Sequence, residues 1–269
     1  MTFSKEFEDV VDLELYPIHN LGSIKGSALV VDARAKLLST GICQLPGFLR
    51  PRAISQTLVQ VAGLADAMWY SENMHTVYFT EANEFVAQEH PLRYQVRSAK
   101  KALAFDLIPS SSPIKKLYES EVMTKFIGAV LNINPLYKSE DPLDCLEIAS
   151  FQPGDELGWH FDNSEFSVTL MLQSPSEGGE FEFVPALRSD AFPNYEGLQQ
   201  IIEGGATTGC IHINAAPGTL TLFRGRHALH RVAVVKGQVT RVNAVLTYSA
   251  LPGMRLSELT QRLFYGRIV

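Results

Sequence analysis

Apolar residues recur at helical spacing in the first half of the chain. In residues 52–70 they fall at every third or fourth position, which places them on one face of a helix. Residues 114–131 show the same spacing and predict a second helix. We expect both helices to support one face of a barrel. Residues 1–50 mix short strand candidates with turns, and a loop at 46–48 is expected to lead into the first helix.

The second half of the chain has the pattern of strands instead. Short runs rich in β-branched and apolar residues are separated by turns that contain glycine and proline. These runs predict strands at residues 145–151, 166–172, 180–184, 218–223, 229–235 and 239–248. The predicted fold class is therefore β-rich α+β, with a helical first half and a β-rich second half.

An insertion at residues 185–217 interrupts the predicted strands and contains a short helical pattern at 195–202. Long insertions inside a compact domain are often functional, so this one is either a lid or a packing segment that covers a sheet edge. In the preceding strand, Glu180 and Glu182 alternate with phenylalanines, so one pair of side chains faces the barrel interior. Alternation alone leaves open which pair this is.

Residues 158–162 read GWHFD and place a histidine and a carboxylate two positions apart. On a strand, His160 and Asp162 point to the same face, so one strand can present both to a metal ion. A third ligand has to come from another strand, and His230 lies in the predicted strand 229–235. Two histidines and one carboxylate form the facial triad of non-haem Fe(II) sites, which leaves coordination positions open. These three residues are the predicted metal ligands and catalytic residues.

His227 competes with His230 as the distal ligand because it lies only three residues earlier. His230 is preferred, since it lies inside an apolar strand pattern, whereas His227 falls in the polar turn 224–227. Arg241 follows on the next predicted strand. A buried arginine near a metal requires a carboxylate, which its planar guanidinium can bind through two parallel hydrogen bonds.

The residues around the triad resemble the Fe(II)/2-oxoglutarate oxygenases, which are built on a double-stranded β-helix, the cupin-like jelly roll. The resemblance covers about the C-terminal two thirds of the chain. Five segments are more narrowly similar to a family of radical halogenases and hydroxylases that act on free amino acids, including lysine. They read WHFDNSEF at 159–166, GGEFEF at 178–183, PGT at 217–219, FRGR at 223–226 and YGR at 265–267.

The resemblance implies Fe(II), 2-oxoglutarate as co-substrate, and O2. It also implies that Arg241 holds the distal carboxylate of 2-oxoglutarate, helped by Thr169 or another hydroxyl of the barrel wall. Halogenases of this family have glycine at the position of Asp162, which leaves an iron position for chloride. The carboxylate in this chain therefore implies hydroxylation or another outcome without halogenation.

The chain has 269 residues and 46% hydrophobic content, enough for one domain with a sizeable core. We interpret residues 141–250 as the jelly-roll core, which includes the insertion. Residues 1–140 are expected to supply helical support and elements on the substrate side, and residues 251–269 form a C-terminal segment.

A free amino acid carries a carboxylate and an ammonium group that the pocket must fix. Arg97 and Arg93 are the candidates for binding the carboxylate, and Arg97 is preferred. The lysine-acting relatives have a carboxylate where this chain has Asn163 and a histidine where it has Leu157, which favours an uncharged or modified side chain.

Asp144 or Glu147 could supply negative charge from the neighbouring strand, which keeps lysine among the candidate substrates. Asn163 and Asp144 complete the set of predicted substrate-binding residues.

Three functions fit these patterns. The favoured one is hydroxylation of an unactivated C–H bond in a free amino acid or a derivative. The same cofactor chemistry could instead end in desaturation or oxidative cyclisation, or the chain could be a non-enzymatic jelly roll that binds a small molecule. Oxygenases that act on protein side chains or nucleic acid share the triad, but the insertion and the helical first half are better suited to closing over a small ligand.

Charge and cysteine usage narrow the partners and the compartment. The formal net charge is −6, and the scattered basic residues form no stripe, which argues against nucleic acid. No apolar run approaches about 20 residues, so no membrane span is expected. The acidic N-terminus does not resemble a signal peptide. Cys43, Cys145 and Cys210 lie far apart and suggest no disulfide framework, so the predicted compartment is the cytoplasm.

Overall fold

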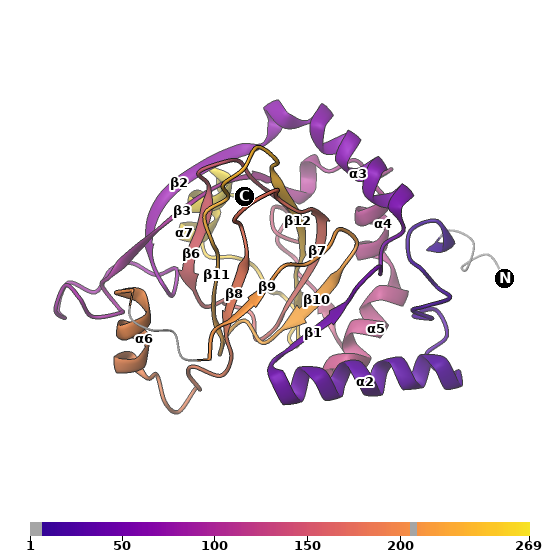
Figure 1. Cartoon of the computed structure of the whole chain (residues 1–269), viewed down its shortest axis with the longest axis horizontal. Helices are drawn as coiled ribbons and strands as arrows, with labels where there is room; N and C mark the ends of the chain where they lie inside the picture. The colour runs from indigo at the N-terminus through magenta and orange to yellow at the C-terminus, as the bar shows by residue number, and fades with distance from the viewer. Residues whose placement is uncertain (1–6, 205–208) are drawn as a thin grey trace.

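The computed structural model describes residues 7–204 and 209–269. Within them, antiparallel strands form one curled sheet in the order β1-β10-β7-β12-β5-β3-β6-β11-β8-β9, and β2 also pairs with β3 (Figure 1). Strands β4 and β13 form a separate small sheet. The elements are α2 (Ile24–Thr40), β1 (Ile42–Leu45), α3 (Pro51–Gly63), β2 (Trp69–Thr76), β3 (Gln95–Leu103), α4 (Pro113–Glu119), α5 (Glu121–Leu131), β4 (Tyr137–Lys138), β5 (Leu146–Phe151), β6 (Glu156–His160), β7 (Ser167–Gln173), β8 (Phe181–Val184), α6 (Tyr195–Ile202), β9 (Ile211–Ile213), β10 (Leu220–Phe223), β11 (Leu229–Val232), β12 (Arg241–Leu246), β13 (Tyr248–Ser249) and α7 (Glu258–Tyr265). This arrangement confirms the predicted jelly-roll fold of the β-rich α+β class.

Side-chain alternation in β5, β7, β10 and β12 divides the fold into a core and a cavity. One face of these strands packs against helices α2–α5 in the main hydrophobic core, which includes Leu146, Ile148, Val168, Leu170, Leu220, Leu222, Val242 and Ala244. The alternate positions line an internal cavity and include Glu147, Ala149, Phe151, Thr169, Met171, Thr221, Phe223, Asn243 and Val245. The helices therefore cover the outside of this half of the sheet, and polar groups on the inside are available for chemistry.

The helices of the first half differ from the predicted ones in their boundaries. The helix predicted at 52–70 ends at Gly63, and the chain then enters strand β2. The helix predicted at 114–131 is two helices, because Ser120 ends α4 and its hydroxyl accepts a hydrogen bond from the Met123 amide at the start of α5. No helix in the described ranges is both long and apolar enough to cross a membrane.

The prediction of short strands and turns for residues 1–50 is wrong over 24–40, which form α2. Only Gly26, Ala33 and Leu37 of this helix are buried, so its apolar residues do not form the regular stripe that the sequence analysis sought. The first half also contributes more than helices. Strands β1, β2 and β3 belong to the main sheet, so residues 1–140 supply part of the barrel itself.

Helix α6 of the insertion packs on the outside of the sheet, whereas Ile213 and Ala215, near the end of the insertion, line the cavity. Leu198, Ile201 and Ile202 of α6 pack with Trp159 and Phe161 in a separate cluster. Figure 1 shows α6 well away from the helices α2–α5. Strand β9 extends the sheet by pairing with β8. The position of α6 fits the packing interpretation, and its bounds match the helix predicted at 195–202.

The C-terminal segment forms a wall of the cavity. Helix α7 packs along β2, where the side-chain amide of Asn73 donates a hydrogen bond to the carbonyl of Leu263 over 2.8 Å. Met254, Leu256, Thr260 and Phe264 line the cavity. Gly266 ends the helix at a positive φ of 64°, and a Cβ there would lie 2.4 Å from the Trp69 ring. The segment is therefore fitted closely to β2.

Candidate metal centre

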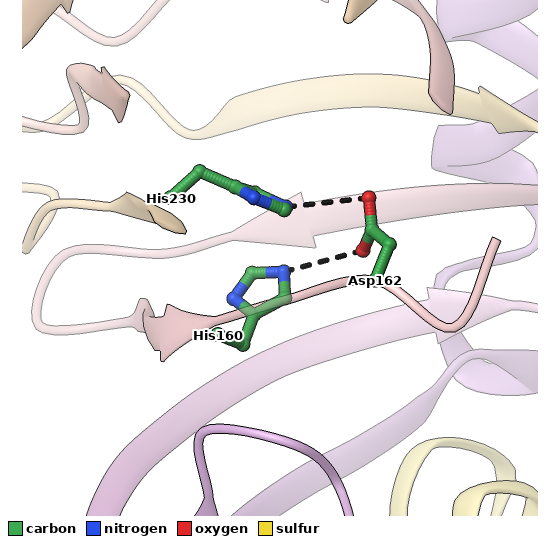
Figure 2. A group of neighbouring side chains, drawn as sticks. All are labelled: His160, Asp162 and His230. Carbon is green, nitrogen blue, oxygen red and sulfur yellow. Dashed lines mark ion pairs between the residues drawn. The ribbon is translucent and has the colours of Figure 1, made fainter. Parts of the chain in front are cut away.

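Strand pairing brings the predicted ligands together. His160 at the end of β6 lies directly opposite His230 of β11, and the two ring centroids are 4.1 Å apart. Asp162 lies between them, with Oδ1 3.6 Å from His160 Nε2 and Oδ2 3.3 Å from His230 Nε2 (Figure 2). One potential ligand atom from each residue lies within 4.8 Å of the others. This is the geometry of a three-residue metal site with one open side.

The strand β6 ends at His160, so Asp162 lies just beyond it and not on it as predicted. The alternation of side chains nevertheless continues. Trp159 and Phe161 point into the outer cluster under α6, whereas His160 and Asp162 point into the cavity. The Asp162 amide donates to the carbonyl of Gly225 over 3.1 Å, which fixes the chain past the strand end.

Each histidine is oriented by a backbone carbonyl. Nδ1 of His160 donates to the carbonyl of Gly158 over 2.7 Å, and Nδ1 of His230 donates to that of Ala228 over 3.0 Å. With Nδ1 donating to a carbonyl, the other ring nitrogen, Nε2, faces Asp162 and is the atom each histidine can offer to a metal. Both metal-binding nitrogens are thus prepared without any change of side-chain position.

The charge states of the site suit a cation. Burial lowers the pKa of His160, and the neighbouring His230 lowers it further, so the imidazole is neutral. Burial alone would raise the pKa of Asp162, but the two histidines beside it hold that pKa well below its ordinary value. Neutral imidazoles and an ionised carboxylate are the forms that ligate a divalent metal. The residues therefore fit Fe(II) held by two nitrogens and one oxygen.

Two small residues hold the carboxylate of Asp162 in place. The Ser167 hydroxyl donates a hydrogen bond to Asp162 Oδ2. Gly225 lies against the same oxygen, and a Cβ at that position would be 2.1 Å from it and 2.7 Å from Ser167 Oγ. Only glycine leaves room for the carboxylate and its hydroxyl partner together.

Replacing Gly225 with alanine is therefore expected to lower the affinity for Fe(II) or Mn(II) by about 10–100-fold, the usual effect of disturbing a group that orients a ligand. Calorimetric metal titration of the purified variant measures this. Gly63→Ala is the matched control, because no atom lies within 4 Å of the Cβ it would add. Equal metal affinity in both variants would show that Asp162 does not depend on this space.

His227 does not belong to the site. Its Nε2 lies 3.1 Å from Asp190 Oδ1 in an ion pair on the insertion side. The preference for His230 over this competitor agrees with the positions of the side chains.

Arg241 is a buried cation in the same cavity. Its side chain donates a hydrogen bond to Asn243 Oδ1, and its guanidinium lies 5.4 Å from the ring centroid of Phe151. Its Nε has no hydrogen-bond partner, and within the described residues no carboxylate acts on its charge. Burial lowers the pKa of Arg241 to about 10. A buried cation without a counter-ion is costly, so the site is prepared for an anionic ligand.

Thr169 lines the cavity but does not neighbour Arg241 along the strands. It lies opposite Val245, four residues further along β12. Asn243, two residues from Arg241, is the polar residue that contacts the guanidinium. Asn243 was not among the predicted site residues, although its same-face spacing from Arg241 was visible in the predicted strand.

A second polar group of the cavity consists of Lys100, Asp144, Glu147 and Tyr265, and we call it the Lys100 cluster. The Lys100 ammonium forms a buried ion pair with Glu147. The Tyr265 hydroxyl lies 2.7 Å from Asp144 Oδ1 and 3.1 Å from Glu147 Oε2, and the Thr247 hydroxyl donates to Asp144 Oδ2 over 3.1 Å. Burial and the charge of Glu147 raise the pKa of Asp144 to about 7.

The predicted substrate residues are thus divided between the cavity and the surface. Asp144 and Asn163 line the cavity. Arg97, the preferred carboxylate ligand, does not: it forms ion pairs with Glu72 at 3.0 Å and Glu156 at 2.9 Å on the outer side of β3. These two glutamates neutralise the charge of Arg97, so it is not available to a substrate in the cavity.

Arg93 is also outside the cavity lining, where it donates to the carbonyl of Val86 over 3.0 Å. The cations in the cavity lining are Lys100, Arg231 and Arg241, and Lys100 lies on strand β3, which was not predicted.

Comparison with known proteins places the chain in a family. The Halogenase D family matches residues 29–261, so the chain belongs to this family. No match was found among curated proteins. The solved structures that resemble it include an oxidoreductase of the 2OG-Fe(II) oxygenase family from Burkholderia pseudomallei, with 18% identity, a TM-score of 0.53, and coverage of 83% of this chain and 92% of the other.

Two further structures share the fold. The epimerase SnoN in complex with Fe3+, α-ketoglutarate and nogalamycin RO is 13% identical, with a TM-score of 0.55 and coverage of 86% of this chain and 93% of its own. A prolyl hydroxylase from Trichoplax adhaerens, in complex with a peptide fragment of hypoxia inducible factor, is 14% identical, with a TM-score of 0.51 and coverage of 83% and 90%. Family membership, fold and triad together define the chain as an Fe(II)/2-oxoglutarate-dependent oxygenase.

Proposed function

We propose that this oxygenase hydroxylates an unactivated C–H bond of a free amino acid or a close derivative. The observation that carries the proposal is the Lys100 cluster, because it places a cation and two carboxyl groups in the wall of the cavity that holds the triad. A free amino acid offers the complementary carboxylate and ammonium. The Lys100 ammonium has three donors and uses one for Glu147, so it can also bind a substrate carboxylate.

Arg241 supports 2-oxoglutarate as co-substrate. Its guanidinium has no ion-pair partner within the described residues and donates to Asn243 through one nitrogen only, so it can bind a carboxylate through two parallel hydrogen bonds. The triad would hold Fe(II) through His160, Asp162 and His230. With O2, the iron and co-substrate then supply the oxidising power for attack on an unactivated carbon.

Asp162 favours hydroxylation over halogenation within this family. Its carboxylate stands against both histidines and is fixed by Ser167, so the position that glycine would leave for chloride is filled. Desaturation and cyclisation depend on how the substrate lies, and they remain outcomes of the test below.

A buried Lys100 cluster also favours a free amino acid over a peptide. Lys100 and Glu147 are both about 5% exposed, and Tyr265 covers them from α7. A residue inside a peptide chain has no terminal charges to pair with these groups, and burying an amide against a charged pair would be unfavourable. The expected compartment is still the cytoplasm, because the separated cysteines suggest no disulfide framework.

The test is an assay with Fe(II), 2-oxoglutarate and a mixture of free amino acids, reconstituted without oxygen and then started with air. Mass spectrometry of the amino acids is compared with the succinate formed. Gain of one oxygen on one amino acid, absent in His160→Ala, is the expected result. Loss of two hydrogens would replace hydroxylation with desaturation or cyclisation. Succinate that stays at background with every amino acid would contradict the proposed substrate class.

Substrate capture should depend on the ionisation of Asp144. Its raised pKa of about 7 results from burial and from Glu147, with Tyr265 and Lys100 acting in the opposite direction. An ionised carboxylate binds an ammonium better than a protonated one does, so kcat/KM for the amino acid should rise as pH increases through about 7.

Asp144→Asn should remove this rise and lower kcat/KM at pH 8. A folded-state pKa above the unfolded value means that ionised Asp144 destabilises the fold at pH 8, so the variant should keep or raise its Tm there. A pH profile unchanged in the variant would assign the titration to another group.

A further inference from the structure

This inference concerns the side chain of the substrate, and it rests on the proposed function. We propose that the amino acid substrate has an uncharged, aliphatic side chain, held between the Lys100 cluster and the triad by an apolar wall. Two independent features of the cavity support this assignment: the number of its carboxyl groups and the nature of the surface between its two polar ends.

The carboxyl groups that line the cavity are already accounted for. Asp162 belongs to the metal site, and Glu147 is paired with Lys100. Asp144 alone has no cationic partner in an ion pair within the described residues. The α-ammonium of the substrate requires this one carboxylate. A second ammonium, at the end of a lysine or ornithine side chain, would find none left in the cavity, and an unpaired buried cation is strongly disfavoured.

Aromatic rings connect the two polar ends of the cavity. The Phe79 ring lies 5.0 Å from the His160 ring and 5.2 Å from the Phe264 ring, measured between centroids. Lys100 Nζ in turn lies 4.7 Å from the Phe264 centroid. These rings therefore offer an apolar surface to a molecule with its charged end at Lys100 and a carbon near the metal ligands.

The cavity lining also contains the apolar side chains of Leu157, Met254, Leu256 and Val245, and its polar side chains on this side, Thr247 and Thr260, carry no charge. Aromatic faces can attract a cation, but Lys100 already occupies that role at Phe264. Asn163, which lines the cavity next to the metal site, offers an amide and no charge. This wall therefore favours the burial of CH2 and CH3 groups over the burial of a second ammonium group.

Norleucine and lysine test the proposal directly, because norleucine has the carbon chain of lysine without the terminal ammonium. We expect kcat/KM for oxidation to be at least about 100-fold higher for norleucine. Calorimetry without oxygen, on the protein loaded with Fe(II) and 2-oxoglutarate, should show the same order of affinity. Lysine that binds and reacts as well as norleucine would overturn the proposal while leaving amino acid hydroxylation intact. If neither these nor leucine, isoleucine and ornithine are oxidised, both this proposal and the proposed function fail.

A pair of variants separates charge from shape. Leu157→Glu adds a carboxylate to the apolar wall, and Leu157→Gln adds an uncharged side chain of the same size. The preference for norleucine over lysine should fall at least about 10-fold in the glutamate variant relative to the glutamine variant, because an opposite charge now stands in the wall. An equal preference in both folded variants would show that the charge of the wall does not select the substrate.

Discussion

Replacing His230 with alanine should reduce the formation of succinate from 2-oxoglutarate by at least about 100-fold, because even residues that merely orient a ligand commonly contribute 10–100-fold to metal affinity. The variant removes one of the three ligand atoms that lie within 4.8 Å of one another. Two ligands, His160 and Asp162, cannot define the open face of the triad alone. Metal content of the purified variant and succinate formation are the two measurements.

His227→Ala provides the matched control for this variant. It removes a histidine three positions away, whose partner is Asp190 and not the triad. Its succinate formation should stay within about twofold of the parent protein, since substitutions away from buried networks usually have small effects. If His227→Ala lost its metal and His230→Ala kept it, the assignment of the distal ligand would be wrong.

The positions of His160, Asp162 and His230 in the chain explain why the triad could be predicted from sequence. His160 and Asp162 are close in the chain, and a spacing of two residues orients both side chains whether or not the strand continues past His160. His230 was identifiable because an apolar strand surrounds it, while His227 lies in a turn. The prediction of the ligands thus depended on local patterns, which stay the same when the strand boundary is wrong by one or two residues.

The Lys100 cluster could not be found in the same way. Its four members come from β3, the turn before β5, β5 itself and α7, and they meet only after the sheet has curled. Arg97, which was preferred as the cation for the substrate, lies three residues from Lys100 on β3, and Lys100 was not considered. The two point to opposite sides of the strand, so Arg97 meets surface carboxylates and Lys100 meets the cavity. Without the strand β3, that difference is invisible.

The strands were predictable where one face of each strand packs in the core and the other face lines the cavity. Strands β5, β7, β10 and β12 have a core on one side and a cavity on the other, so their patterns are regular. Helix α2 buries only three residues, and strands β2 and β3 were hidden in a stretch with many charged and polar residues. Tertiary packing, and not local sequence preference, determines these elements.

The same packing explains which segment closes the cavity. The insertion had the length of a lid, but α6 lies on hydrophobic residues of the outer face. The C-terminal segment, to which no role in the site was assigned from the sequence, contributes Phe264 to the cavity and Tyr265 to the Lys100 cluster. Changes in α7 should therefore affect the amino acid substrate more than the metal.

Arg241→Met should have opposite effects on the free and the liganded protein. In the free protein the buried guanidinium has an unsatisfied Nε and no acidic partner within the described residues, so an apolar side chain of similar length should raise the Tm. With Mn(II) present and oxygen excluded, 2-oxoglutarate at 100 times its Kd would stabilise the parent protein by about 2.7 kcal/mol. The variant should lose this stabilisation, and KM for 2-oxoglutarate should rise by at least about 100-fold.

Arg97→Met is the control, because Arg97 is an arginine of the same sheet that already has Glu72 and Glu156 as partners on the surface. Removing it should lower the Tm slightly, since exposed ion pairs contribute about 0–1 kcal/mol, and should leave the response to 2-oxoglutarate unchanged. Thermal unfolding of the parent protein and both variants, each with and without 2-oxoglutarate, gives three comparisons. If Arg241→Met kept the full 2-oxoglutarate response, the co-substrate carboxylate would have to bind elsewhere, and the unpaired charge of Arg241 would need another ligand.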